Sequence, residues 1–163
     1  IGAGPVGLCA MLCARLFGAA EVIALDTDET RLRVARERGL CRLALNPRHL
    51  GETEALVRGQ TAGRGADAVI EAAGGETSFE LAWRLARPNA VVAAMYGKNL
   101  IFKTGGVDAV HGERLMKLIE AGALDTSFLL THRAPLNDIL EGYRVFGQKA
   151  AGCLKWAVTP YER

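Results

Sequence analysis

Three glycines near the start of the sequence, Gly2, Gly4 and Gly7, constrain the fold more than any other feature. They have the spacing G-x-G-x-x-G and open an apolar stretch from Pro5 to Phe17 in which Arg15 is the single charged residue. Gly2 permits a tight turn, Gly4 allows the backbone to approach a pyrophosphate, and Gly7 lets a helix pack closely on a sheet. Glycines also punctuate ordinary turns, so the motif predicts dinucleotide binding only where an acid ends the next strand.

That acid is Asp26, which ends the apolar run Val22–Leu25. A carboxylate at the tip of a strand can accept both hydroxyls of an adenosine ribose, whereas a 2′-phosphate there would meet a like charge. The pattern therefore predicts NAD in preference to NADP. Two alternatives stay open at this point. Asp26 could cap the following helix, for which Asp28 is also placed, and Arg31 could be a ribose ligand or simply part of a basic helix surface.

Short apolar runs alternate with amphipathic segments along most of the chain, which predicts an α/β fold. We expect a Rossmann-type, doubly wound parallel sheet with right-handed crossovers, whose first strand is truncated to Ile1. From that truncation we expect the chain to be a fragment of a longer protein. The expected helices are residues 5–17, 29–38, 52–61, 77–86, 113–121 and 136–146, and the expected strands are residues 22–25, 41–45, 68–74, 90–95, 100–104, 129–132 and 154–158.

After the expected strand 90–95 and Tyr96, three residues, Gly97 to Asn99, precede the expected strand 100–104. Such a connection is too short for a parallel crossover, which takes a dozen residues or more. Either the two strands form an antiparallel hairpin, or a loop is missing near Tyr96. We also expect the strand Leu100–Thr104 to lie at a sheet edge and to pair with its counterpart in another subunit, which predicts a homo-oligomer.

Composition excludes several classes of function. The 20 Lys and Arg residues against 18 Asp and Glu are scattered along the chain, so no nucleic-acid partner is expected. The longest uncharged run ends at Ala14, short of the roughly 20 residues that a membrane span needs. The four cysteines form no C-x-x-C and have no histidine at ligand spacing, which predicts reduced thiols in a cytoplasmic protein and no metal site. No residue is assigned a catalytic role.

The sequence resembles the medium-chain, zinc-dependent alcohol dehydrogenases, a family that includes sorbitol and threonine dehydrogenases. The matching stretches follow family order along the whole chain, which is more specific than the glycine motif alone. They are IGAGPVGL at residues 1–8, VIALDTDETR at 22–31, GRGADAVIEAAG at 63–74, KNLIFKTGG at 98–106, LTHRAPL at 130–136 and GCLKWAV at 152–158.

The resemblance implies that residues 1–124 are an NAD-binding domain and that residues 125–163 return to a catalytic domain absent from this sequence. The family's zinc, which polarises the oxygen of a small-molecule alcohol, belongs to that absent domain. The chain is therefore expected to hold NAD but no zinc, and to be inactive by itself. The implied cofactor-binding residues are Gly2, Gly4, Pro5, Val6 and Gly7 at the pyrophosphate, Asp26 and Arg31 at the ribose, Ala73 at the cleft wall, Gly105 at the nicotinamide and Lys155 at a phosphate oxygen.

Two other classes share the glycine motif and the acid at the strand end. One is a non-catalytic dinucleotide-sensing module, such as the regulatory domain of a potassium transporter. The other is the FAD-binding start of a flavoprotein, in which Glu is more usual at the position of Asp26. Neither class requires the stretches at residues 98–106 and 130–136.

Overall fold

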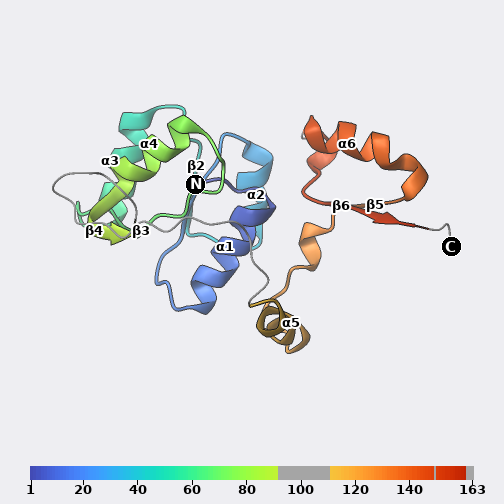
Figure 1. The fold of residues 1–163 in the computed structure, drawn as a ribbon. Helices are drawn as coiled ribbons and strands as arrows, with labels where there is room; N and C mark the ends of the chain where they lie inside the picture. Colours follow the sequence, from blue (N-terminus) through green and yellow to red (C-terminus); the bar gives the residue numbers. More distant parts are fainter. Residues whose placement is uncertain (92–110, 149, 161–163) are drawn as a thin grey trace. The chain divides into compact units, whose positions relative to one another are not determined.

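The computed structural model describes residues 1–91, 111–148 and 150–160 (Figure 1). The chain divides into two compact units, Ile1–Ala109 and Val110–Arg163. The expected strand Leu100–Thr104, the segment around Tyr96 and Gly105 lie outside the described residues. The domain boundary expected after Leu124 concerns the whole protein and stays a prediction.

The first helix follows directly from the glycine motif. Helix α1 spans Pro5–Leu16, and proline at its first position suits a helix start because it lacks an N–H and has a fixed φ. Gly18, with φ of +87°, ends the helix in the left-handed conformation that glycine adopts most readily. Leu8 and Met11 are buried on its inner face. The helix expected from Pro5 is therefore confirmed.

Strand β1 (Ile23–Leu25) pairs in parallel with β2 (Leu43–Leu45), and helix α2 (Glu29–Glu37) connects them. The side chain of Asp28 accepts hydrogen bonds from the backbone N–H groups of Thr30 and Arg31, so Asp28 caps α2. This is the expected β-α-β unit, with both strands shorter than the apolar runs that contain them.

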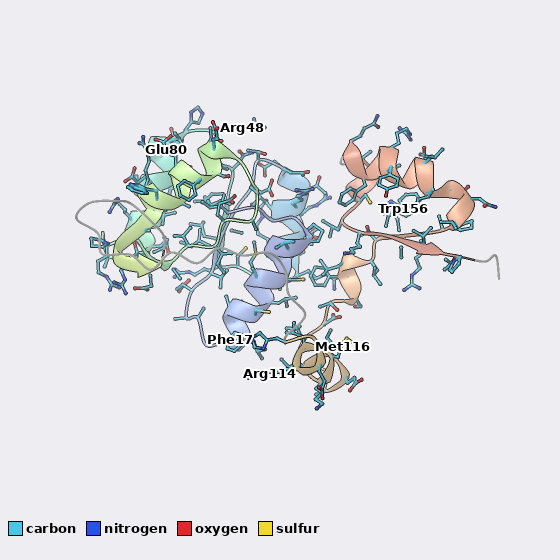
Figure 2. All side chains as sticks on the ribbon, in the orientation of Figure 1. Phe17, Arg48, Glu80, Arg114, Met116 and Trp156 are labelled. Carbon is cyan, nitrogen blue, oxygen red and sulfur yellow. The ribbon has the colours of Figure 1, made fainter. Side chains whose placement is uncertain are left out.

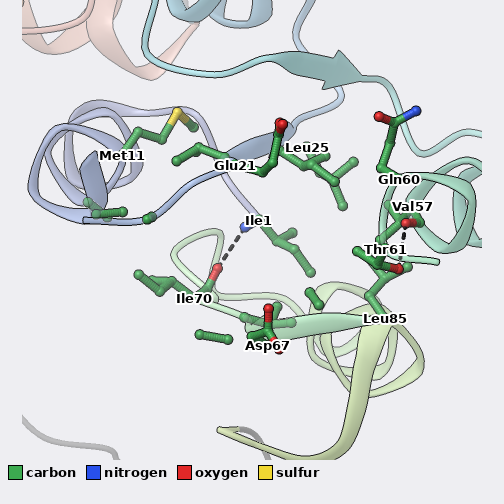
Figure 3. A pocket seen from close by; sticks show the side chains of 18 of the residues that line it. Ile1, Met11, Glu21, Leu25, Val57, Gln60, Thr61, Asp67, Ile70 and Leu85 are labelled. Carbon is green, nitrogen blue, oxygen red and sulfur yellow. Dashed lines mark hydrogen bonds between the residues drawn. The ribbon is translucent and has the colours of Figure 1, made fainter. Parts of the chain in front are cut away.

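Ile1 and Gly2 connect strand β1 to the segment at residues 70–72 through backbone hydrogen bonds. The Ile1 ammonium donates to the Ile70 carbonyl over 2.6 Å (Figure 3), and Ala72 N–H donates to the Ile1 carbonyl over 2.8 Å. On the other side, Gly2 N–H donates to the Leu25 carbonyl over 2.7 Å. One residue that bonds to positions 70 and 72 has the pattern of a parallel ladder. The spatial order β2, β1, Ile1–Gly2 and residues 70–72 is that of a Rossmann sheet.

Strand β3 (Ala66–Ala68) precedes this segment and pairs in parallel with β4 (Ala86–Val91). The expected strand at residues 68–74 is thus wrong in its bounds. The regular strand begins earlier because Ala66 pairs with Ala86, and it ends at Ala68, beyond which Ile70 and Ala72 form hydrogen bonds with Ile1. Helix α4 (Glu76–Leu85) passes into β4 without a loop, so Pro88 lies inside the strand and does not terminate the helix.

Helices α3 (Leu50–Gln60) and α4 cover the hydrophobic core of the first unit. The core joins Leu25 of β1 to Val57 of α3 and to residues of α4, all less than 4% exposed, and Ile1 packs against it. Burial of each such side chain contributes roughly 1.5–3 kcal/mol. The remaining members of the cluster are Leu81 and Leu85, with Ile23, Leu45 and Val69 packed against them.

The second unit contains helix α5 (Gly112–Glu120) and a β-α-β unit made of β5 (His132–Pro135), α6 (Ile139–Gly147) and β6 (Trp156–Thr159). Trp156, labelled in Figure 2, stacks on His132 with ring centroids 5.3 Å apart. A Cβ on Gly142 of α6 would lie 2.8 Å from the indole nitrogen of Trp156, so glycine is required there. Short 3-10 turns span Ser127–Leu129, Leu136–Asp138 and Ala150–Gly152.

Two strand predictions in this unit are shifted. The strand expected at residues 129–132 starts at His132, because Ser127–Leu129 form a 3-10 turn. The carboxylate of Asp125 accepts from the backbone N–H of Ser127 and so stabilises that turn. The strand expected at residues 154–158 likewise starts later, at Trp156. Across the described parts of the chain, no helix is long and apolar enough to cross a membrane.

A cavity of about 480 Å³ lies between β1 and β3 (Figure 3). Ile1, Met11 and Val57 contribute to its walls, together with Val22 and Ala66 at the amino ends of the two strands. Dinucleotides bind at the carboxyl edge of such a sheet. The cavity is also lined by Gly2, Gly7 and Ala72, so it adjoins the glycine turn from the side of the amino ends of the strands.

Candidate functional site

The glycine turn is held by backbone contacts that exclude any side chain. Gly2 has φ of +91°, and a Cβ there would lie 2.9 Å from the carbonyl carbon of Ala72. A Cβ on Gly7 would lie 1.7 Å from the Gly2 carbonyl oxygen, so α1 crosses directly over the turn. The structural roles expected of Gly2 and Gly7 are confirmed, and their contact with a cofactor stays a prediction.

The N-terminus of α1 is open to a ligand. Gly4 is the N-cap of α1. Within the described residues, no side chain accepts a hydrogen bond from the backbone N–H groups at this end of the helix. Pro5 and Val6 begin the helix, and Val6 is 70% exposed. A Cβ on Gly4 would meet the guanidinium of Arg31 at 3.3 Å and no backbone atom within 4 Å. Exposed N–H groups and the helix dipole favour an anion at such a position. These residues fit a diphosphate.

Asp26 connects the end of β1 to the glycine turn. Its Oδ2 accepts from Ala3 N–H over 2.7 Å, its Oδ1 accepts from Asp28 N–H over 2.8 Å, and the residue is 8% exposed. Because Asp28 caps α2, the alternative in which Asp26 is merely the helix cap is wrong. Each carboxylate oxygen accepts one hydrogen bond here and retains capacity for a second. Asp26 can therefore hold the turn and still accept from a ribose hydroxyl.

Arg31 is brought to the same place. Its Nη1 lies 3.9 Å from Asp26 Oδ2 and its Nε lies 3.8 Å from Asp28 Oδ2, and the side chain is 19% exposed. Arg33, on the same helix, is 63% exposed and pairs with Glu37 at the surface. The structure thus separates Arg31 from the basic surface of α2. It also places a positive charge beside Asp26, which weakens the argument that the charge of Asp26 alone selects NAD.

Glu71 was not predicted from the sequence. It lies shortly after the end of β3, whereas Asp26 directly follows β1. Oε1 of Glu71 accepts from Ala73 N–H over 2.8 Å and from Gly74 N–H over 2.9 Å. Partial burial raises the pKa of Glu71, but hydrogen bonds from Gly74, Ala73 and Ser78 and the charge of the Ile1 ammonium outweigh it, so the net pKa lies below the ordinary value. Its signal was present in the sequence, as an acid followed by small residues.

The remaining predicted site residues are divided between the two units. The Ala72–Ala73 peptide lies against Gly2, so Ala73 is beside the glycine turn. Lys155 belongs to the second unit and is exposed, where its carbonyl accepts from His132 N–H over 3.2 Å. Its predicted phosphate contact stays a prediction. The four cysteines, all within the described residues, form no disulfide, and the described residues contain no cluster of three or more His, Cys, Asp or Glu side chains that could hold a metal.

Comparisons with known proteins place this geometry among dehydrogenases. A sequence model of the family described as zinc-binding dehydrogenase matches residues 5–121. An alcohol dehydrogenase of Cupriavidus necator is 34% identical over 176 residues, which cover 97% of this chain and 48% of the relative. The zinc-dependent alcohol dehydrogenase 2 from Streptococcus pneumonia, in its apo form, superimposes with a TM-score of 0.91 at 26% identity and covers 99% of this chain and 51% of that one.

A structure with a bound nucleotide is also similar. It is named as a zinc-binding dehydrogenase from Sinorhizobium meliloti 1021 bound to NADP, and it matches with a TM-score of 0.78 at 25% identity over 98% of this chain and 51% of that one. The chain thus spans about half the length of the relatives it matches. The expected α/β, Rossmann-like fold is confirmed by these matches and by the parallel pairing of the strands.

Proposed function

The chain belongs to the zinc-binding dehydrogenase family, and from that premise we propose that residues 1–124 form the NAD-binding domain of an alcohol or polyol dehydrogenase. The observation that carries this proposal is the uncapped N-terminus of α1 beside Gly4, with Asp26 and Arg31 at the end of the neighbouring strand. A dinucleotide-sensing module and a flavoprotein are less favoured, because the matched relatives include an alcohol dehydrogenase and an L-arabinitol 4-dehydrogenase.

Each group has a specific role in this proposal. The N–H groups at the start of α1, around Gly4, Val6 and Gly7, bind the diphosphate. Asp26 accepts from the adenosine ribose hydroxyls while it retains the Ala3 N–H. Arg31 lies within reach of the ribose and the diphosphate and offsets their negative charge. When bound, NAD supplies the hydride acceptor.

NAD is the proposed coenzyme, although one similar structure holds NADP. The burial of Asp26 supports this choice as well as its charge. A 2′-phosphate would have to approach a carboxylate that is 8% exposed and already held by two backbone N–H groups. Asp26 has no freedom to turn away, so it cannot make room for the phosphate without releasing the glycine turn.

The zinc chemistry and the alcohol substrate are proposed for the whole protein. Because the chain spans about half the length of its relatives, we assign zinc to the part of the protein outside this sequence. Residues 125–163 are proposed to complete that catalytic domain, and Lys155 to reach a phosphate oxygen. Gly105 is proposed to approach the nicotinamide. The chain by itself is expected to bind NADH without oxidising alcohols.

The oligomeric state and the cellular location of the whole protein are proposed from the sequence and from its cysteines. The whole protein is proposed to be a homo-oligomer that pairs through Leu100–Thr104, which rests on the sequence alone. The protein is also proposed to be cytoplasmic, because four cysteines that form no disulfide suit a reducing compartment. Size-exclusion chromatography of the whole protein tests the oligomer, since a monomer at high concentration would contradict it.

A single substitution tests nucleotide binding. Gly4→Ala places a methyl group at the diphosphate position, and the one atom group it crowds is the end of the Arg31 side chain, which can move. We expect NADH affinity, measured by calorimetry on the full chain, to fall roughly tenfold or more, which corresponds to about 1.4 kcal/mol. Gly51→Ala is the matched control because a Cβ there meets nothing within 4 Å. Equal NADH affinity in both variants would overturn the proposal.

A further inference from the structure

One carboxylate oxygen organises the loop that follows the segment at residues 70–72. Besides the Ala73 and Gly74 N–H groups, Oε1 of Glu71 lies 2.9 Å from the hydroxyl oxygen of Ser78. That hydroxyl also accepts from Gly75 N–H over 3.0 Å. The network runs from Glu71 to the first turn of α4 and fixes the whole Ala72–Gly75 loop.

Other backbone hydrogen bonds hold the two ends of the loop: Ala72 N–H donates to the Ile1 carbonyl, and the Gly75 carbonyl accepts from Phe79 N–H. The four residues of the loop are alanines and glycines, and Ala73 and Gly74 are exposed. Gly74 has φ of +77°, and a Cβ there would meet nothing within 4 Å. Glycine-containing segments have many accessible conformations in the absence of a specific constraint. The hydrogen bonds to Glu71 supply that constraint at Ala73 and Gly74, in the middle of the loop.

The position of this loop decides which half of a dinucleotide it faces. Asp26 follows β1 on one side of the Ile1–Gly2 segment, and residues 70–72 lie on the other side. Dinucleotides cross the carboxyl edge of such a sheet, with the diphosphate over the glycine turn. With the adenosine ribose at Asp26, the nicotinamide half must extend toward Ala73. The Ala72–Ala73 peptide is itself in contact with Gly2.

We propose that Glu71 is a positioning residue that holds the Ala72–Gly75 loop as the wall of the nicotinamide half of the cofactor site. This inference rests on the proposed function, because it needs the dinucleotide in the stated orientation. Glu71 acts through backbone N–H groups and does not touch the reacting atoms. Its loss therefore weakens the contacts of the nicotinamide half and leaves those of the adenosine half in place.

The test compares two ligands that differ by the nicotinamide group, NADH and ADP-ribose. Dissociation constants are measured by calorimetry for the full chain and for Glu71→Ala, Glu71→Gln and Glu80→Gln. Glu80, labelled in Figure 2, is the control because it lies on the same helix as Ser78 and is 60% exposed, and its carboxylate pairs with Arg84. Hydrogen exchange at Ala73 and Gly74 reports on the loop directly.

We expect Glu71→Ala to weaken NADH binding roughly tenfold and ADP-ribose binding by less than about twofold. Glu71→Gln keeps a neutral hydrogen-bond acceptor, so its NADH affinity is expected to lie between those of Glu71→Ala and the unmodified chain. Glu80→Gln is expected to leave both affinities unchanged. If Glu71→Ala does not fold, Glu71→Gln carries the comparison. Equal weakening of both ligands, or no weakening of NADH, would overturn the positioning role. Failure of the unmodified chain to bind either ligand would instead contradict the proposed function.

Discussion

Oδ2 of Asp26 accepts a hydrogen bond from the backbone N–H of Ala3 over 2.7 Å, and this bond ties the glycine turn to the end of the neighbouring strand. The acid that is expected to bind the ribose is therefore also part of the structure that presents the diphosphate site. We therefore expect nucleotide selectivity and local stability to be coupled at this residue.

Asp26→Asn should reduce stability. An amide has a single acceptor oxygen, so one of the N–H groups of Ala3 and Asp28 would face an NH₂ group and lose its partner. A buried donor left unpaired costs about 1–3 kcal/mol, which urea unfolding would measure. Asp28→Asn is the control, because asparagine caps helices about as well as aspartate. If Asp28→Asn lowered the free energy of unfolding as much as Asp26→Asn, the buried hydrogen bond from Ala3 would not be the cause of the destabilisation.

Gly7→Ala should be among the most damaging small substitutions in the first unit. Its Cβ would lie 1.7 Å from the Gly2 carbonyl oxygen, which is backbone and cannot rotate away. Either α1 or the turn must move, and we expect a loss of at least about 3 kcal/mol or failure to fold. Gly59→Ala, in α3 with nothing within 4 Å, should instead stabilise by about 0.5–1 kcal/mol. Circular dichroism during heating compares the two. A Gly7→Ala variant with an unchanged Tm would contradict the close packing of α1 on the turn.

Acid should loosen the loop held by Glu71. The folded state lowers the pKa of Glu71 below its ordinary value of 4.5. The ionised carboxylate therefore contributes stability that is fully present above that ordinary value and is lost as the pH falls through the lower folded-state pKa. In Glu71→Gln this part of the acid dependence should be absent. Urea unfolding of both proteins from pH 3 to pH 7 measures the difference, and parallel curves for the two would count against the assigned hydrogen bonds.

Arg31→Ala should weaken nucleotide binding without much change in stability. Arg31 lies beside Gly4 and 3.9 Å from Asp26, so its removal takes a positive charge away from the diphosphate site. We expect NADH affinity to fall roughly three- to tenfold, since one partly exposed ionic contact contributes about 1 kcal/mol. Arg33→Ala, on the exposed side of the same helix, should leave the affinity unchanged. Calorimetry on the two variants distinguishes a ligand role for Arg31 from a general attraction of the nucleotide to a basic helix. If the attraction were general, both substitutions would weaken NADH binding.

The sequence predicts the elements of the first unit well where the pattern is local. Pro5 and Gly18 set the two ends of α1, and Asp28 sets the start of α2, because these residues impose backbone geometry or satisfy end groups by themselves. Strand bounds are less predictable, since they depend on partners distant in sequence. The pairing of Ala66 with Ala86 determines where β3 begins, and no local pattern specifies it.

In the candidate site, too, the features that follow from local sequence are predictable and those that depend on distant partners are not. The motif predicts that Gly2, Gly7 and Asp26 come together, because their roles follow from a turn, a helix and a strand end. The bond from Ala3 and the approach of Arg31 to Asp26 depend on how α2 returns toward the turn, which spacing alone does not give. Glu71 was missed for a different reason. Its three hydrogen-bond donors are local, but the importance of the loop depends on its contact with Gly2.

The most direct test of the account is a comparison of NADH and NADPH binding to the full chain by calorimetry at one salt concentration. The account predicts that NADH binds at least roughly tenfold more tightly, because the buried carboxylate of Asp26 accepts from the free ribose hydroxyls and opposes a 2′-phosphate. Tighter binding of NADPH than of NADH would contradict it.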